Sequence, residues 1–273
     1  MKADSLIPSL AAGALAGSML VFPREAASAV LSALTDFTAA VLPGLLPFSI
    51  CALLLTAGRS LPIPALTLLA LPGGSPTGAR LLRDAGLSPA QAKRAAARTG
   101  GMSPMFFLAT LSSWLGDARA GALLLISHIA AALLCGCMVG EKCKGRVTLP
   151  PLSLPQAAAQ GGQAMLTAAS CAALGAAAAR MIGCALPRLP GGLLAALQAM
   201  LEITGGTRML CQARAPLPLI AGLTGFTGLS ILLQNAAFWQ RSGLTLFDLC
   251  KTALLRAGLS AALMLALYQI FSI

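Results

Sequence analysis

Leu71-Pro-Gly-Gly-Ser-Pro-Thr-Gly-Ala-Arg80 interrupts a strongly apolar part of the chain, and Thr99-Gly-Gly-Met-Ser-Pro104 follows after a charged segment. The glycines, prolines and hydroxyl residues of both stretches break helices and leave backbone polar groups without helical partners. Inside a bilayer such groups are tolerated only where protein buries them or where they line a watery cavity. We therefore expect both stretches to line a cavity in a membrane-embedded fold.

The composition is typical of an integral membrane protein. Hydrophobic residues make up 57% of the chain and charged residues 10%, whereas a soluble domain carries about 25% charged residues. This argues against the alternative of a soluble all-helical protein. The formal net charge is +11, but the basic residues are scattered through short connections between apolar stretches. We interpret them as determinants of membrane topology, and no nucleic-acid partner is expected.

Seven apolar stretches are long enough to cross a bilayer core of roughly 30 Å as helices. The second is expected to be kinked by Pro43 and Pro47, and the third should begin unwound at Gly100. The chain is thus predicted to be an all-helical, multi-pass protein of the lipid bilayer. The seven predicted spans are residues 6–22, 29–57, 99–115, 120–139, 157–186, 217–239 and 247–271.

Two further apolar pieces are too short to cross and are predicted to be re-entrant helical hairpins. Residues 61–82 break at Pro72-Gly73-Gly74, and residues 193–212 contain Thr204-Gly205-Gly206-Thr207. In each hairpin the tight turn would join two half-length helices. The chain would then return to the side that it left.

Two polar segments separate these elements. Leu87–Arg98 is basic and is expected at the surface as a helix, with Ser88 as its N-cap and Pro89 at its first position. Glu141–Pro155 is the clearest linker. It separates a first repeat (28–140) from a second repeat (156–273), and an N-terminal extra span (1–27) precedes the first.

The two halves carry matching residues. Gly206-Thr-Arg-Met-Leu210 matches Gly78-Ala-Arg-Leu-Leu82 at one constant offset. In addition, Thr224 precedes Trp239 by the same number of residues as Thr99 precedes Trp114. These matches indicate an internal repeat. Because each unit holds three spans, an odd number, the second unit would be inverted in the membrane, which is the plan of many secondary transporters.

The distribution of basic residues predicts the orientation. With seven spans, one face collects twelve Lys and Arg residues and the other six. The more basic face is expected in the cytoplasm. The N-terminus and residues 141–155 would then be cytoplasmic, and the C-terminus would lie outside the cell membrane.

The eight cysteines lie mostly inside apolar stretches and are interpreted as buried thiols. Cys135-x-Cys137, followed by Cys143, lacks the paired spacing and the histidines of a zinc site. His128, the single histidine, is interpreted as a helix-packing residue, with ligand binding as the alternative. No metal or other cofactor is expected.

Four motifs occur in an order and spacing that resemble the YlbJ-like sporulation integral membrane proteins. They are Pro43-Gly-Leu-Leu-Pro-Phe48, Gly73-Gly-Ser-Pro-Thr-Gly-Ala-Arg80, Ser127-His128 and Gly228-Leu-Ser-x-x-x-Gln234. That family carries nucleoside-recognition, or Gate, domains, and its architecture is similar to that of concentrative nucleoside transporters. The resemblance implies a multi-span carrier linked to moving dipicolinate toward the developing spore.

The hairpin tips are candidate binding sites. A helix N-terminus offers free N–H groups and a positive dipole end to an anion. Ordinary turn residues are the alternative interpretation. A nucleotide-binding P-loop is excluded because no Gly-Lys-Ser/Thr follows the glycines. The tip residues are Ser75, Thr77 and Gly78 in the first hairpin and Thr204, Gly205, Gly206 and Thr207 in the second.

Three charged residues lie beside the tips. Arg80 and Arg208 occupy matching positions, where each could grip a carboxylate in bidentate fashion or extend to the membrane interface. Glu202 lies in the apolar half of the second hairpin. Ionisable groups in the membrane are costly, so Glu202 is expected to contact a substrate, relay a proton or pair with Arg208.

The polar residues of the third and sixth spans complete the predicted site. Ser103, Ser230, Gln234 and Asn235 could bind a ligand or bond a neighbouring helix. In the inverted plan, the two tips and the broken starts of these spans meet near the bilayer midplane. Thr77 and Gly78 are then expected to face Thr204, Gly205 and Thr207.

Together these features predict a membrane transporter for a small anionic metabolite, with dipicolinate as the candidate implied by the resemblance. A nucleoside transporter is one alternative. Another is a non-transporting sporulation assembly factor that keeps the Gate scaffold. Each of these functions is compatible with a homo-oligomer. An enzyme is not expected, because the sequence has no evident metal cluster, no nucleophile with a base and no paired acids.

Overall fold

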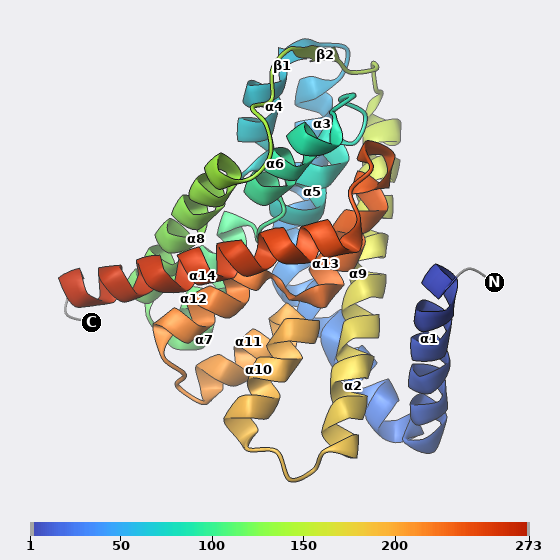
Figure 1. The fold of residues 1–273 in the computed structure, drawn as a ribbon, viewed down its shortest axis with the longest axis vertical. Coiled ribbons are helices and arrows are strands. Elements are labelled where there is room, and N and C mark those ends of the chain that lie inside the picture. The colour runs from blue at the N-terminus through green and yellow to red at the C-terminus, as the bar shows by residue number, and fades with distance from the viewer. Residues whose placement is uncertain (1–2, 272–273) are drawn as a thin grey trace.

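The computed structural model describes residues 3–271. They fold into helices joined by turns and loops, with one short pair of antiparallel strands (Figure 1). Within this range five helical segments are long and apolar enough to span a bilayer. They indicate a multi-pass membrane protein. The five segments are Pro23–Thr56, Ala118–Met138, Leu154–Ala185, Leu217–Ser242 and Leu246–Phe271.

The first half of the chain ends with the second strand, in the segment that joins the halves. Its elements are α1 (Ala3–Val21), α2 (Pro23–Asp36), the π-helix η1 (Phe37–Val41), α3 (Leu42–Thr56), β1 (Ser60–Pro62), α4 (Ile63–Ala70), α5 (Gly74–Leu82), α6 (Pro89–Thr99), the π-helix η2 (Phe106–Leu111), α7 (Ser112–Leu115), α8 (Ala118–Met138) and β2 (Arg146–Thr148).

The second half begins with the longest single helix. Its elements are α9 (Leu154–Ala185), α10 (Gly191–Leu201), α11 (Ile203–Gln212), α12 (Leu217–Phe226), α13 (Gly228–Trp239), the 3₁₀ turn η3 (Gln240–Ser242) and α14 (Leu246–Phe271). In Figure 1, α9 runs along the long axis of the molecule, whereas α14 lies across it.

The five long segments coincide with five of the seven predicted spans, and α1 and Phe106–Leu115 correspond to the other two. The first predicted span coincides with α1 up to Val21, and this helix is apolar from Ser9 to Val21. The third begins with residues 100–103, which are not helical, as predicted for its start, and Phe106–Leu115 continues it as an apolar helix. The glycines and Pro104 at this point remove the regular helical hydrogen bonds.

Both predicted hairpins are pairs of short helices that pack against each other, α4 with α5 and α10 with α11. They lie at different ends of the molecule, with α4 near the top of Figure 1 and α10 near the bottom. In the second hairpin the close approach depends on Gly206. A Cβ atom at that position would overlap the backbone nitrogen of Ala199.

The basic segment predicted at the surface is instead half-buried as α6. Its capping box is present, since Ser88 Oγ accepts from Gln91 N–H at 3.3 Å and Gln91 Oε1 accepts from Ser88 N–H at 3.2 Å. One face carries fully buried alanines, among them Ala92 and Ala95, and packs against α8 and α14. The alanines allow this close packing, which charge counting along the sequence did not anticipate.

The sixth predicted span is broken in its middle, not at its start. Thr227 has a φ of 72° and Gly228 a φ of 79°, so the chain leaves the right-handed helical region between α12 and α13. A β-branched residue with positive φ is strained. The broken helix α12–α13 thus follows α11. In the same way α5 is followed by α6 and then, after the non-helical residues 100–103, by η2 and α7.

The predicted linker is partly ordered. β2 pairs with β1 in antiparallel register, Ser60 opposite Thr148 and Pro62 opposite Arg146. Arg146 Nη2 also donates to Ser60 O. The connection between the halves is therefore fastened to the entrance of the first hairpin.

The two halves share one order of elements: a long helix, a helical hairpin, an interrupted helix and a final long helix. The boundaries recur at the interval that separates Gly78 from Gly206 in the sequence. The same interval lies between the starts of α6 at Pro89 and α12 at Leu217, and between the starts of α8 and α14.

Candidate functional site

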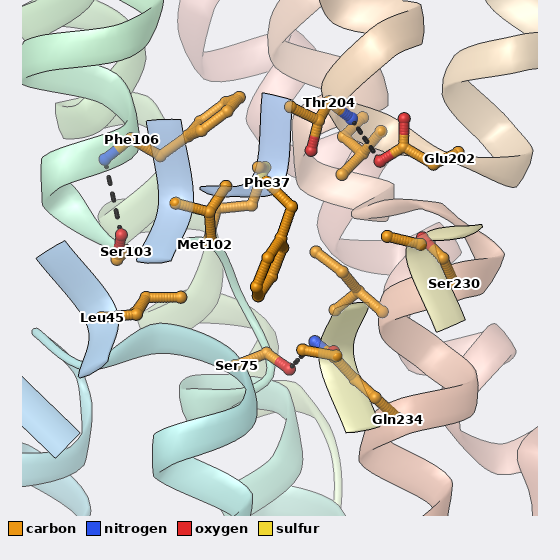
Figure 2. A pocket seen from close by; sticks show the side chains of 15 residues that line it. Phe37, Leu45, Ser75, Met102, Ser103, Phe106, Glu202, Thr204, Ser230 and Gln234 are labelled. Carbon is orange, nitrogen blue, oxygen red and sulfur yellow. Dashed lines mark hydrogen bonds between the residues drawn. The ribbon is translucent and has the colours of Figure 1, made fainter. Parts of the chain in front are cut away.

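A cavity lies where both hairpin tips and both interrupted helices come together (Figure 2). The hairpins contribute Ser75 and the Glu202–Thr204 turn. Long helices of both halves close its remaining sides. The residues lining it are Phe37, Val41, Leu45, Ser75, Met102, Ser103, Phe106, Ala168, Ala172, Glu202, Ile203, Thr204, Ser230, Ile231 and Gln234.

The cavity is mostly apolar and small. The space open to the centre of a water-sized sphere is about 50 Å³, enough for a few water molecules. In Figure 2 the ring of Phe37 lies between Met102 and Gln234 and fills much of the centre. A metabolite would therefore need the side chains around Phe37 to move.

Both π-helical segments border this cavity. Phe37 and Val41 lie on η1, Phe106 lies on η2, and the two segments contact each other. Departures from regular α-helix of this kind are frequent at functional sites.

The first hairpin tip is tied to α13 by a buried hydrogen-bond network. Ser75 Oγ donates to Asn235 Oδ1 at 2.7 Å and accepts from Gln234 Nε2 at 2.7 Å. Ser75 N–H donates to Gly101 O at 2.8 Å, and Asn235 Nδ2 reaches Gly100 O at 3.5 Å. The network joins three of the elements that line the cavity, two from the first half and one from the second.

The second hairpin tip is capped by its own carboxylate. Glu202 Oε1 accepts from Thr204 N–H at 2.9 Å, and Oε2 accepts from Gly205 N–H at 2.7 Å. Glu202 is only 4% exposed. The N–H groups predicted to receive a ligand at this tip are therefore occupied by Glu202, and the predicted pairing of Glu202 with Arg208 is absent.

A larger polar cleft adjoins the cavity through Glu202, which lines both. The cleft opens about 460 Å³ to water-sized spheres and includes Arg180, Gln198 and Gly205. Arg208 also lines it, and its Nη1 forms an ion pair with Asp36 Oδ1 at 2.8 Å. Arg208 thus connects the second hairpin to α2, where the sequence offered no obvious partner.

Arg80 lies in a different cleft, beside the linker. Its Nη1 pairs with Asp84 Oδ2 at 3.5 Å, and its Nη2 donates to Gln160 Oε1 on α9 at 2.5 Å. Arg83 and Arg241 also pair with Asp84, at 3.1 and 2.9 Å. Arg80 is therefore part of a charge cluster and does not line the cavity.

The remaining predicted tip residues do not line the cavity. Thr77 and Thr207 are fully buried, and Gly78 packs so closely on Thr99 that a Cβ would lie 2.7 Å from the threonine Cβ. Gly206 faces Ala199. Thr77, Gly78 and Thr207 do not line the cavity, and Ser75 is the residue of the first tip that reaches it.

Sequence reasoning missed the apolar walls of the cavity and left the role of His128 open. The apolar walls from the long helices, Phe37 and Ala168 among them, were missed, although phenylalanine is scarce enough to have been a signal. His128 lies outside the cavity. Its Nε2 accepts from Met102 N–H at 3.2 Å, so the histidine supports the interrupted helix as a packing residue would.

Six predicted residues line the cavity and one more, Asn235, supports it. The six are Ser75, Ser103, Glu202, Thr204, Ser230 and Gln234. Chemically, the arrangement offers hydroxyl and amide groups, one carboxylate and two aromatic rings.

No protein-family model, curated protein or solved structure matches the chain.

Proposed function

We propose that this protein is a membrane carrier whose substrate site is the cavity between the two hairpins and the two interrupted helices. One observation carries the proposal: four irregular backbone segments converge on a single buried site in an otherwise apolar helical protein. In a bilayer such backbone is tolerated where it lines a binding cavity. A purely structural protein would have no need to gather these segments at one site.

The chemistry of the cavity favours a small, uncharged, nucleoside-like solute. Phe37 and Phe106 offer rings against which a planar group can stack, while Ser230, Thr204 and Gln234 offer hydrogen bonds. Glu202, the single charged residue among those that line it, can accept from sugar-type hydroxyl groups. It would repel an anion.

An anionic metabolite, predicted from the sequence with dipicolinate as the example, is the second candidate. The observation in its favour is the adjoining cleft, where Arg180 and Arg208 accompany Glu202. There an anion would have to compete with Asp36 for Arg208. The resemblance to the YlbJ-like family stays a prediction, as does the alternative of an assembly factor without transport.

We further propose that the two halves form an inverted repeat of seven spans, with residues 141–155 in the cytoplasm and the C-terminus outside. The constant interval between the starts of corresponding elements supports this plan. α1 would be the first span, and Phe106–Leu115 would be the main helical part of the interrupted third span.

The experiment is uptake by purified protein in lipid vesicles, with radiolabelled uridine, adenosine and dipicolinate. We expect nucleoside uptake above that of empty vesicles. Gln234→Ala should reduce it roughly five- to 150-fold, because one lost hydrogen bond that leaves its partner buried costs about 1–3 kcal/mol. Gln163→Ala, on the exposed face of α9, is the matched control and should transport normally.

Glu202→Gln distinguishes the two solute classes. It should weaken uridine uptake and strengthen any dipicolinate uptake, because it removes the charge that opposes an anion. If folded wild type moves none of the three solutes, the carrier proposal is wrong for these classes. Dipicolinate uptake that depends on Arg208 and is unchanged by Gln234→Ala would favour the second candidate.

A further inference from the structure

Arg256, in the middle of α14, is buried to 2% exposure and bonds to both interrupted helices. Its Nε donates to Gly225 O at 2.8 Å and its Nη1 to Ala97 O at 3.2 Å. Its Nη2 reaches Gly100 O and Thr227 Oγ1, both at 3.3 Å. One side chain thus joins the ends of α6 and α12.

Three of the four acceptors are carbonyl groups that these helices leave free where they stop, and the fourth is the Thr227 hydroxyl. A helix C-terminus carries roughly −0.5 of an elementary charge, so two such ends together amount to about −1. A guanidinium supplies the balancing charge. Within residues 3–271 no ion pair of Arg256 with an Asp or Glu is present, so these helix ends are its counter-charge.

We propose that Arg256 is a built-in cation at the crossing of the two interrupted helices and takes the place of a bound coupling ion. Broken helices in membrane carriers commonly direct their C-terminal ends at a bound cation. Here the covalently attached guanidinium meets that need, so solute movement should require neither Na⁺ nor K⁺. This second part rests on the proposed carrier function, whereas the structural part does not.

The relation of Arg256 to His128 supports this assignment. The two residues are separated along the chain by the same interval as the starts of α8 and α14, so they occupy equivalent positions on these helices. His128 accepts the N–H of Met102 within the first break, and Arg256 donates to Ala97 O just before the break and to Gly100 O at its start. The final long helix of each half therefore sends one polar side chain to the breaks.

The number of acceptors accounts for arginine at this position. The guanidinium has five N–H donors in a fixed planar fork, whereas a lysine ammonium is a point charge with three donors. Four acceptors on two helices match the fork. A neutral side chain would leave two like-signed helix ends facing each other with buried, unpaired carbonyls.

The test compares Arg256→Lys, Arg256→Gln and Arg256→Ala by thermal unfolding in detergent. Each is measured in guanidinium, sodium, potassium or choline chloride at equal, low millimolar concentration. Arg256→Ala should lower Tm by roughly 5–10 °C, since several buried acceptors lose their donor. Guanidinium should restore part of this loss and choline should not. Arg188→Ala, in the exposed loop before α10, is the control and should unfold at the wild-type temperature in every salt.

Comparing a charged with a neutral substitution shows whether position 256 needs a positive charge or only hydrogen-bond donors. Arg256→Lys should unfold at a higher temperature than Arg256→Gln, and this comparison also serves if Arg256→Ala does not fold. An Arg256→Gln variant as stable as Arg256→Lys, or rescue of Arg256→Ala by choline as well as by guanidinium, would overturn the assignment of a built-in cation.

Coupling is tested with the intact protein in vesicles. Uridine uptake in sodium, potassium and choline media should agree within about twofold, well under the tenfold that 1.4 kcal/mol of coupling would produce. A tenfold fall in choline would overturn the replacement of a coupling ion. A wild type that takes up no uridine would instead count against the proposed function, and the thermal measurements would still decide the role of Arg256.

Discussion

At the scale of single residues, the two halves are joined by a few buried polar side chains. Ser75, Gln234 and Asn235 connect the first hairpin to α13, and Arg256 connects α14 to both breaks. Each bond is made where the surrounding protein is apolar. Because an unpaired polar group is most costly in such surroundings, these few residues carry a large share of the specificity of the fold.

Ser75→Ala should destabilise the protein by about 1–3 kcal/mol, because it leaves Gln234 Nε2 and Asn235 Oδ1 without their partner. Thermal unfolding in detergent measures this. Ser170→Ala is the matched control, since its exposed hydroxyl bonds only to Leu166 O of its own helix. Equal stability of the two variants would mean that the network contributes nothing.

Asp84 makes the stability of the linker-side cleft depend on pH. Burial alone would raise the pKa of Asp84, but the hydrogen bond and charge of Arg83, with the charges of Arg80 and Arg241, hold it below the usual range. A lowered folded pKa stabilises the protein above the unfolded pKa, about 3.9. This stabilisation is lost as the pH falls through the folded pKa.

Asp84→Asn should therefore cost about 0.5–1 kcal/mol near neutral pH, the size expected for partly exposed ion pairs. The difference in Tm between variant and wild type should shrink toward zero in acid. Unfolding curves between neutral pH and about pH 3 measure it. A difference that stays constant over this range would show that the charge of Asp84 is not the source of the effect.

At the scale of elements, the hairpins and interrupted helices depend on glycines that permit close approach. α10 and α11 meet at Gly206, where a side chain has no space. The break between α6 and η2 brings Gly101 so close to His128 that a Cβ would overlap the imidazole. These contacts place the hairpin and the break, and through them the walls of the cavity.

Gly206→Ala should destabilise the second hairpin by about 3 kcal/mol, because its Cβ would meet the backbone of Ala199 and not a movable side chain. Gly192→Ala, in α10 of the same hairpin, has open space around the new Cβ and should be neutral or stabilising by up to about 1 kcal/mol. Thermal unfolding should thus show a clear fall in Tm for Gly206→Ala and an unchanged or higher Tm for Gly192→Ala. Equal effects would contradict the close packing described here.

At the scale of the whole molecule, the linker-side cleft and the Glu202 cleft lie at opposite ends of α9. Gln160 lines the first, and Ala176, Ala179 and Arg180 line the second. Sixteen to twenty helical residues span roughly 24–30 Å, about the thickness of a bilayer core. Each half thus presents one cleft with arginine and acidic side chains, and the cavity lies between them.

Labelling tests this arrangement. In a cysteine-free chain reconstituted in vesicles, Gln160→Cys should react with a charged thiol reagent from the side that carries residues 141–155. Arg180→Cys should react from the other side. Labelling of both from one side would mean that α9 does not cross the membrane, and the proposed inverted repeat would be wrong.

The sequence by itself determined the helical class, the five long apolar segments, both hairpins and the break at Gly100. These follow from hydropathy, length and the backbone chemistry of glycine and proline, which are local properties. Only the tertiary structure decided which polar groups find each other: Glu202 caps its own helix, Arg208 pairs with Asp36, and Arg256 joins two helix ends. Partners separated by up to 172 residues depend on how helices cross. That crossing is set by packing of side chains over the whole molecule, which no local pattern encodes.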